Sequence, residues 1–139
     1  MKPAYINIDA NNQPTTEPHL AVRVEHPLLA RPIIVTAERS PKRMTHEQAT
    51  KWAESLDING WSWRLPTVEE AFLICDRTRP DNVLPPENFP DCDGEWIWTS
   101  TPVAWNSGAA WGVYLNFGGS SWSSRDFDLH ARAVRAGQF

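Results

Sequence analysis

Three carboxylates at alternate positions are the feature of the sequence best suited to holding a metal ion. They are Asp91, Asp93 and Glu95, in the stretch "DCDGEW". Hard cations such as Ca²⁺ bind clustered oxygen ligands, but this spacing does not complete an EF-hand loop. The E-P-N, Q-P-D and W-N-D signatures of calcium-dependent, sugar-binding lectins are also missing. We keep the three residues as a calcium candidate, while the sequence as a whole predicts no metal site and no cofactor.

The histidines and cysteines do not form a recognisable catalytic pattern. The four histidines are His19, His26, His46 and His130. They fall in separate expected elements, and no nucleophile elbow, phosphate-binding loop or metal-ligand spacing accompanies them. Cys75 and Cys92 cannot complete a four-ligand zinc site on their own, and they are either reduced thiols or a disulfide. The sequence therefore predicts a protein that is not an enzyme.

Residues 103–130 have the composition of a binding surface. This segment mixes Trp, Tyr, Asn, Ser, Arg, Asp and Gly, the residues that antibody loops use as rigid aromatic anchors and adaptable hydrogen-bonding groups. We predict that it binds a protein or glycan ligand; the alternative is that Trp105 and Trp122 only cap a sheet. The predicted ligand-binding residues are Trp105, Asn106, Tyr114, Asn116, Trp122, Arg125, Asp126 and Phe127.

Strand alternation separates core from surface within this segment. The stretch "AWGVYLNF", residues 110–117, is an expected strand, in which successive side chains point to opposite faces. The alternation predicts a core face of Trp111, Val113 and Leu115, and a surface face of Gly112, Tyr114 and Asn116.

Two capping boxes mark the helices that must support this surface. Thr45, followed three residues later by Gln48, begins a helix with apolar residues at helical spacing in "THEQATKWAESL". Thr67, followed by Glu70, begins a second helix, which we expect to stop before Pro80.

Strands are expected on both sides of the two helices. A Pro-rich loop at residues 79–95 separates the second helix from the later strands, and Gly118-Gly119 predicts a hairpin among them. The order of strands, helices and strands predicts one α+β domain over residues 1–139, with residues 1–41 forming its N-terminal strands. The expected strands are 4–8, 20–24, 32–37, 96–100, 110–117, 120–125 and 131–135.

The motif "GWSWRLPT" is interpreted as a structural brace rather than a ligand site. Tryptophans contribute apolar burial, and a neighbouring arginine can bond carbonyl groups or stack on a ring. The predicted structural residues of the motif are Trp61, Trp63, Arg64, Leu65 and Pro66.

Two arginines lie three residues apart on the last expected strand, so they point to opposite faces. We expect one of Arg132 and Arg135 to point inward and to pair with a carboxylate or a carbonyl, and we assign this structural role to Arg135.

Charge and hydropathy exclude several classes of protein. There are 13 Lys and Arg against 17 Asp and Glu, and no basic stripe, so nucleic-acid binding is not expected. The first residues lack the apolar run of a secretory signal, and no stretch reaches the length of a membrane-spanning helix. The sequence therefore predicts a cytoplasmic or virion-associated protein without membrane insertion.

Four motifs in order resemble the Lcl C-terminal domain family of bacteria and phages. They are "GWSWRLPT", "WTSTP", "AWGVYLNFGG" and the closing "ARAVRAGQ", and the resemblance covers about residues 44–138. The resemblance implies a C-type-lectin-like fold, with two helices, small antiparallel sheets, long loops, and paired N- and C-terminal strands. Formylglycine-generating enzymes share this fold class, but their reactive cysteine pair has no counterpart here, since no cysteine follows Cys92.

The resemblance also implies a role in recognition. Variable ligand-contacting residues of diversified relatives lie in the corresponding C-terminal segment. The implied roles are a phage surface or tail component that displays this face, and a small phage product that inhibits a host protein. The alternative from another class is a structural or assembly domain in an oligomer or phage particle. The sequence does not determine the oligomeric state.

Overall fold

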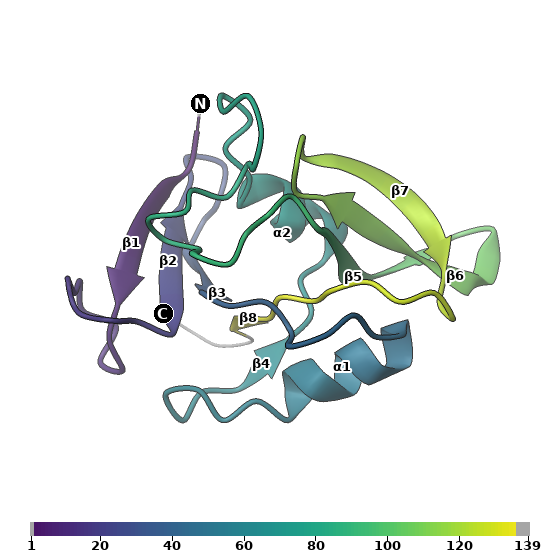
Figure 1. Ribbon diagram of the computed structural model, residues 1–139, viewed down its shortest axis with the longest axis horizontal. Helices are drawn as coiled ribbons and strands as arrows, with labels where there is room; N and C mark the ends of the chain where they lie inside the picture. The colour runs from purple at the N-terminus through teal and green to yellow at the C-terminus, as the bar shows by residue number, and fades with distance from the viewer. Residues whose placement is uncertain (1, 136–139) are drawn as a thin grey trace.

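The chain forms two antiparallel sheets and two helices in the computed structural model, which describes residues 2–135 (Figure 1). The first sheet has the strand order β1-β2-β3-β8-β4, and the second has the order β5-β6-β7. The α+β class predicted from the sequence is confirmed. The elements are β1 (Ala4–Ile8), β2 (Ala21–Glu25), β3 (Ile33–Thr36), α1 (His46–Glu54), β4 (Trp63–Arg64), α2 (Val68–Leu73), β5 (Trp96–Val103), β6 (Asn106–Tyr114), β7 (Gly119–Ser124) and β8 (Val134–Arg135).

Both helices begin at the predicted capping boxes. The Thr45 side chain accepts a hydrogen bond from the Gln48 backbone N–H, and the Gln48 side chain accepts one from the Thr45 backbone. Thr67 and Glu70 make the same reciprocal pair at α2. These bonds satisfy N–H groups that a helix start leaves without partners. Neither helix of the described part of the chain has the length and apolarity needed to cross a membrane.

The C-terminal strand pairs with the last of the N-terminal strands, β3, as the resemblance implied, and not with the first, β1. β8 lies between β3 and β4, while β1 pairs with β2. β8 is also shorter than the predicted strand 131–135. Before it, the backbone N–H groups of Ala131 and Ala133 donate to the hydroxyls of Ser40 and Thr36, so side chains replace part of the strand ladder.

The "GWSWRLPT" motif contains β4, a strand that the sequence did not predict. Trp63 is 3% exposed, and its indole N–H donates to the Ile58 carbonyl at 3.1 Å. The Arg135 guanidinium lies 4.6 Å from the centre of the Trp61 ring. Arg64 makes a bidentate ion pair with Glu70 of α2, at 2.6 and 2.8 Å. The motif therefore ties β8 to the start of α2.

Leu65 and Pro66 complete the placement of this motif. Leu65 is 3% exposed and belongs to the same hydrophobic cluster as Trp63. The Pro66 carbonyl accepts a hydrogen bond from the Ser100 backbone N–H in β5, at 2.8 Å. This bond connects the motif to the three-stranded sheet.

The three-stranded sheet is packed on both faces, because successive residues of a strand point to opposite sides. Ile97 and Val113 belong to a hydrophobic cluster that includes Ala71 of α2. Trp98 belongs to a second cluster that includes Ala49 of α1. The sheet is therefore the layer between the two helices.

The predicted core face of β6 is correct only in part. Val113 and Leu115 are fully buried, but Trp111 is half-buried and packs edge to face against Trp105 at 6.0 Å. Gly112, predicted at the surface, is buried. The turn to β7 spans residues 115–118 and has Gly118 at φ +81°, a conformation that glycine adopts without strain.

Candidate functional site

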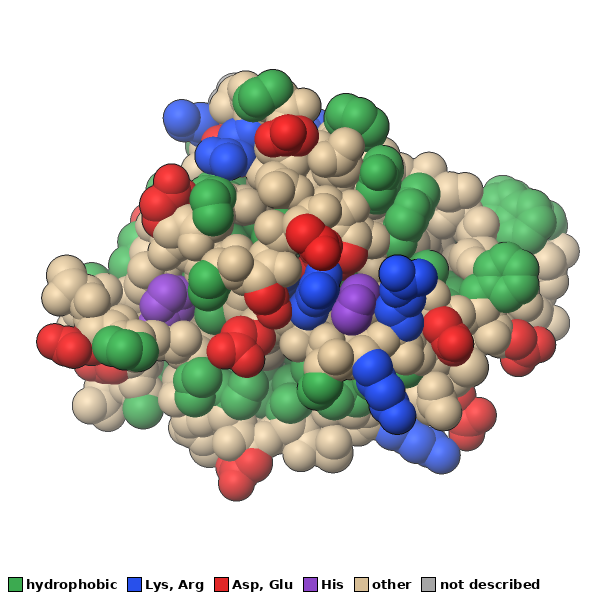
Figure 2. Space-filling model, viewed as in Figure 1, with side chains coloured by type: hydrophobic (Ala, Val, Ile, Leu, Met, Phe, Trp, Pro, Cys, Tyr) green, Lys and Arg blue, Asp and Glu red, His purple; other side chains and the backbone are tan. Residues whose placement is uncertain are grey.

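A groove crosses one face of the molecule beside the three-stranded sheet. It consists of two adjoining cavities, with volumes of about 300 and 230 Å³, which share Trp96 and Leu129. We call it the Trp96 groove. Acidic, basic and histidine side chains gather at the centre of the face in Figure 2. The charged half is further lined by Arg39, Arg43, Asp93, Glu95, Asp128 and His130, and the apolar half by Gly112, Ser121, Trp122 and Ser123.

The apolar half exists because small residues lie beside large aromatic ones. Trp96 of β5 stacks on its cross-strand neighbour Tyr114, with ring centres 4.9 Å apart and planes 11° apart. Gly112 forms the floor, where a Cβ atom would lie 3.4 Å from Leu129 Cδ1 and 3.6 Å from Trp96 Cε3. Its neighbour on β7 is Ser121. A larger side chain at either small residue would occupy the hollow.

A buried arginine organises the wall behind the charged half. Arg132 is 0% exposed, and its Nη2 donates to Asp91 at 2.7 Å and to Glu95 at 3.0 Å. Its Nη1 donates to the Ala37 carbonyl at 2.8 Å. A buried charge is tolerated only when it is paired and hydrogen-bonded. Arg132 therefore joins the loop before β5 to the segment after β3.

This arrangement corrects the assignment of the inward arginine. Arg132 carries the buried ion pairs, whereas Arg135 is partly exposed and stacks on Trp61. The two residues do point to different surroundings, as strand alternation required. The choice between them depended on where the carboxylates of a distant loop lie, which the local pattern does not contain.

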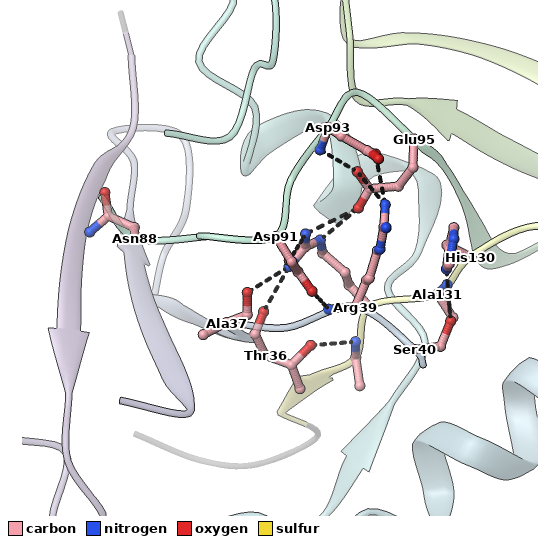
Figure 3. Close-up of polar contacts among 12 residues, drawn as sticks. Thr36, Ala37, Arg39, Ser40, Asn88, Asp91, Asp93, Glu95, His130 and Ala131 are labelled. Carbon is pink, nitrogen blue, oxygen red and sulfur yellow. Dashed lines mark hydrogen bonds and ion pairs between the residues drawn. The ribbon is translucent and has the colours of Figure 1, made fainter. Parts of the chain in front are cut away.

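The calcium candidate is explained by two arginines. Figure 3 shows Asp91, Asp93 and Glu95 turned toward guanidinium groups. Besides the Arg132 pairs, Arg39 Nη1 lies 2.7 Å from Asp93 Oδ1 and 3.8 Å from Glu95 Oε1. Within residues 2–135, no group of three or more His, Cys, Asp and Glu is arranged to hold a metal ion. The spacing that suggested oxygen ligands instead forms an ion-pair network.

The charges of this network lower the pKa of one of its own members, Asp93. Burial by itself would raise the pKa of Asp93, but the Arg39 hydrogen bond and charge hold that pKa below its ordinary value. Asp93 therefore remains a carboxylate at neutral pH, at the rim of the charged half.

His130 and Ser40 form the contact in the groove most similar to a catalytic pair. Ser40 Oγ lies 3.5 Å from His130 Nδ1. However, this hydroxyl donates to the Lys42 carbonyl at 2.8 Å and accepts from the Ala131 N–H at 3.0 Å, and Ser40 is 1% exposed. Burial and the charge of Arg39 lower the pKa of His130. Ser40 therefore holds the backbone together and is not presented to a ligand.

The predicted ligand-binding residues do not form one continuous site. Trp122 lies at the edge of the groove, with its half-exposed side chain on the opposite face of the sheet beside Trp111, and Tyr114 supports the groove by stacking on Trp96. Trp105 packs on Trp111, away from the groove lining. Phe127 is 64% exposed, Asn106 accepts a bond from the Gly108 N–H, and Asn116 lies beside Gly94.

Arg125 and Asp126 lie at α1 instead. They line a separate cavity beside the start of this helix. Arg125 Nη1 lies 3.2 Å from His46 Nδ1, and the other ring nitrogen of His46 lies 2.9 Å from the Thr99 carbonyl. His46 is therefore neutral, with its proton on Nε2, and burial lowers its pKa. This histidine connects α1 to β5.

The sequence reasoning missed most of the groove. A glycine inside a strand pattern signals close approach of other groups, so Gly112 carried a usable signal. Trp96 could have been placed beside Tyr114 from the strand order. Arg39 and Arg43 come from a segment that no motif singled out. Both cysteines are buried free thiols, Cys75 and Cys92.

Most of this fold is covered by a match to a known protein family. A family model described as the Lcl C-terminal domain matches residues 23–135. The chain belongs to this family. A search of curated proteins gives no match. The Lcl C-terminal domain match begins in β2, so it includes β3 and is longer at its start than the region 44–138 inferred from the motifs. Residues 136–138 of that region lie outside the described residues. Every residue that lines the Trp96 groove falls within the family match.

Proposed function

We propose that this Lcl C-terminal domain is a non-enzymatic recognition domain that binds a protein or glycan across the face carrying the Trp96 groove. The observation that carries the proposal is the junction of an apolar hollow with a charged one at Trp96 and Leu129. Aromatic walls supply large contact area with few rotatable bonds, and charged groups at a rim orient a ligand. A C-type-lectin-like fold is part of the proposal.

The charged half supports binding better than catalysis. Asp93 and Glu95 are occupied by arginines, and the hydroxyl nearest to His130 is bonded on both sides. In contrast, the side chains of Arg43 and Asp128 make no hydrogen bond or ion pair with any described residue. These two groups offer opposite charges to a ligand at the edge of the groove.

Two biological settings use such a face in the same way. As a phage surface or tail component, the domain displays the groove outward. As a small free phage product, it occupies a host protein and inhibits it. Both settings require the same exposed aromatic and charged side chains, so one binding experiment serves both.

The test compares two serines of β7 that point to opposite faces. Ser121→Phe fills the apolar half of the groove, and Ser120→Phe places the same ring on the other face of the strand as a matched control. Wild type and both variants are applied to a glycan array and used as bait in host lysate. We expect a partner retained by wild type and Ser120→Phe but lost by Ser121→Phe. A partner bound equally by all three, or no partner at all, refutes the proposal.

A structural or assembly domain is the second candidate. The observation that favours it is the outer edge of β7, the last strand of its sheet, where Trp122 is 50% exposed. Size-exclusion chromatography with light scattering separates the candidates. A tight oligomer in which Trp122 is protected from fluorescence quenchers, together with no ligand for the groove, supports assembly.

A further inference from the structure

β7 presents an open strand edge at Ser120 and Trp122, and at its end the Ser124 carbonyl accepts the Phe127 N–H at 3.0 Å. It pairs with β6 along its whole length, residue for residue from Gly119 to Ser124, without a bulge. Edge strands are normally protected from other chains by charged residues, proline or bulges. The sequence of β7, "GSSWSS", contains none of these. This edge is therefore able to accept another strand.

The hydrogen-bonding direction of the sheet identifies the groups that face outward. The Leu115 N–H bonds to the Glu95 carbonyl, toward β5, and the Tyr114 carbonyl accepts the Gly118 N–H, toward β7. The direction alternates along an antiparallel strand. Every second residue of β6, counted back from Tyr114, therefore bonds β7, and its partners on β7 are Gly119 and every second residue after it. The backbone groups of the intervening residues, Ser120, Trp122 and Ser124, point away from β6, and those of Ser120 and Trp122 are the ones that lie clear of the turn at Phe127.

The strand is self-complementary about Trp122. Residues 120–124 read "SSWSS" in both directions. When two such strands pair antiparallel about a two-fold axis through Trp122, large residues oppose large ones and small residues oppose small ones. The strand carries no charge, so the pairing places no like charges opposite each other, which would be destabilising.

We propose that two copies of this chain pair through β7, antiparallel and centred on Trp122, to form a continuous six-stranded sheet. This is an isologous contact, in which the same surface serves both copies. The Trp122 N–H and carbonyl of each copy bond the Trp122 backbone of the other. Ser120 of each copy lies opposite Ser124 of the partner subunit, and Ser121 opposite Ser123 of the partner subunit.

The second copy completes the candidate site. Ser121, Trp122 and Ser123 form the outer wall of the apolar half of the groove, and pairing sets the β7 of the partner subunit directly against this wall. On the opposite face, Trp111 and Trp122 are cross-strand neighbours, so the two copies align four tryptophan rings across the two-fold axis. The β7 pairing does not depend on the proposed function. The claim that the pairing affects ligand binding rests on the proposed function.

Register-specific disulfide formation tests the pairing. Opposite residues that are not hydrogen-bonded to each other have Cα atoms about 4.5 Å apart, within the roughly 4.4 to 6.8 Å that a disulfide spans. Ser121→Cys and Ser123→Cys chains, mixed and oxidised with diamide, are expected to give a reducible dimer in good yield. Each variant alone serves as the control, because Cys at one position lies diagonal to its copy, at about 7 to 8 Å.

The outcomes separate this inference from the proposed function. A cross-link in the mixture and not in the single variants supports the pairing, even if no ligand binds the groove. Equal cross-linking in all samples, or none in any, overturns it. Unchanged far-UV circular dichroism and melting curves establish that the variants are folded. Wild-type light scattering must also show a dimer that dissociates on dilution, and a strict monomer at about 1 mM overturns the pairing.

Discussion

Replacing Arg132 by methionine is expected to be among the most destabilising single changes in the molecule. The substitution keeps much of the side-chain volume but leaves Glu95, whose side chain is 4% exposed, without its main cation. Breaking a buried ion pair by removing one partner costs about 3 to 5 kcal/mol. For a domain of this size, each kcal/mol lowers Tm by about 3 to 4 °C. We therefore expect Tm to fall by about 10 to 20 °C, measured by circular dichroism, with urea denaturation giving the free energy of unfolding.

Arg39 provides the matched control for this change. Its side chain is 24% exposed and pairs with Asp93, which is 66% exposed, so Arg39→Met should cost no more than about 1 kcal/mol. In the double variant Arg132→Met/Glu95→Gln the unpaired charge is removed, and we expect part of the lost stability to return. Equal losses for Arg39→Met and Arg132→Met, or a double variant less stable than Arg132→Met, would refute the buried-charge explanation.

Three further predictions concern the core and the titrating groups. Trp63→Ala removes a buried ring and should cost about 3 to 5 kcal/mol; an unchanged melting curve contradicts the brace interpretation. Burial lowers the pKa values of His46 and His130, so the unfolded chain binds protons first on acidification. The free energy of unfolding should therefore fall as pH drops below about 6.5. In the double variant His46→Gln/His130→Gln, the free energy of unfolding measured by urea denaturation should change less between about pH 7.5 and 5 than it does in wild type. Burial raises the pKa of Cys75 to about 12 and also raises that of Cys92; a thiol reagent at about pH 8 should label neither cysteine before unfolding and both after it, and labelling of folded protein counts against this.

The features predicted well from the sequence depend on neighbours along the chain. Both capping boxes join a threonine to a residue three positions later, so the two helix starts are local properties of the sequence. The strands were predicted to within a few residues for the same reason, because alternation is local. The two-residue β4 was missed, since a segment this short is a strand only through its pairing with β8.

The candidate site depends on residues that are distant along the chain. The acidic stretch at 91–95 has the pattern of a cation site, but in the folded protein its carboxylates form ion pairs with Arg39 and Arg132. The predicted binding face was drawn from one continuous segment, yet only Trp122 of that set lines the groove. The other residues of that set lie outside the groove lining, because the hairpin turns and the segment after β7, which runs to α1, point their side chains in different directions.

The sequence by itself determined the fold class, the two helix starts and membership of the family, because capping, alternation and motif order are written in neighbouring residues. The tertiary structure alone decided which arginine is buried, that the carboxylates pair with arginines, and that Trp96, Gly112 and Leu129 enclose a hollow. The physical reason is that charge pairing and cavity shape depend on distances between segments. The pairing energy of Arg132 with Glu95, 37 positions apart, exists only after the sheets have brought them together.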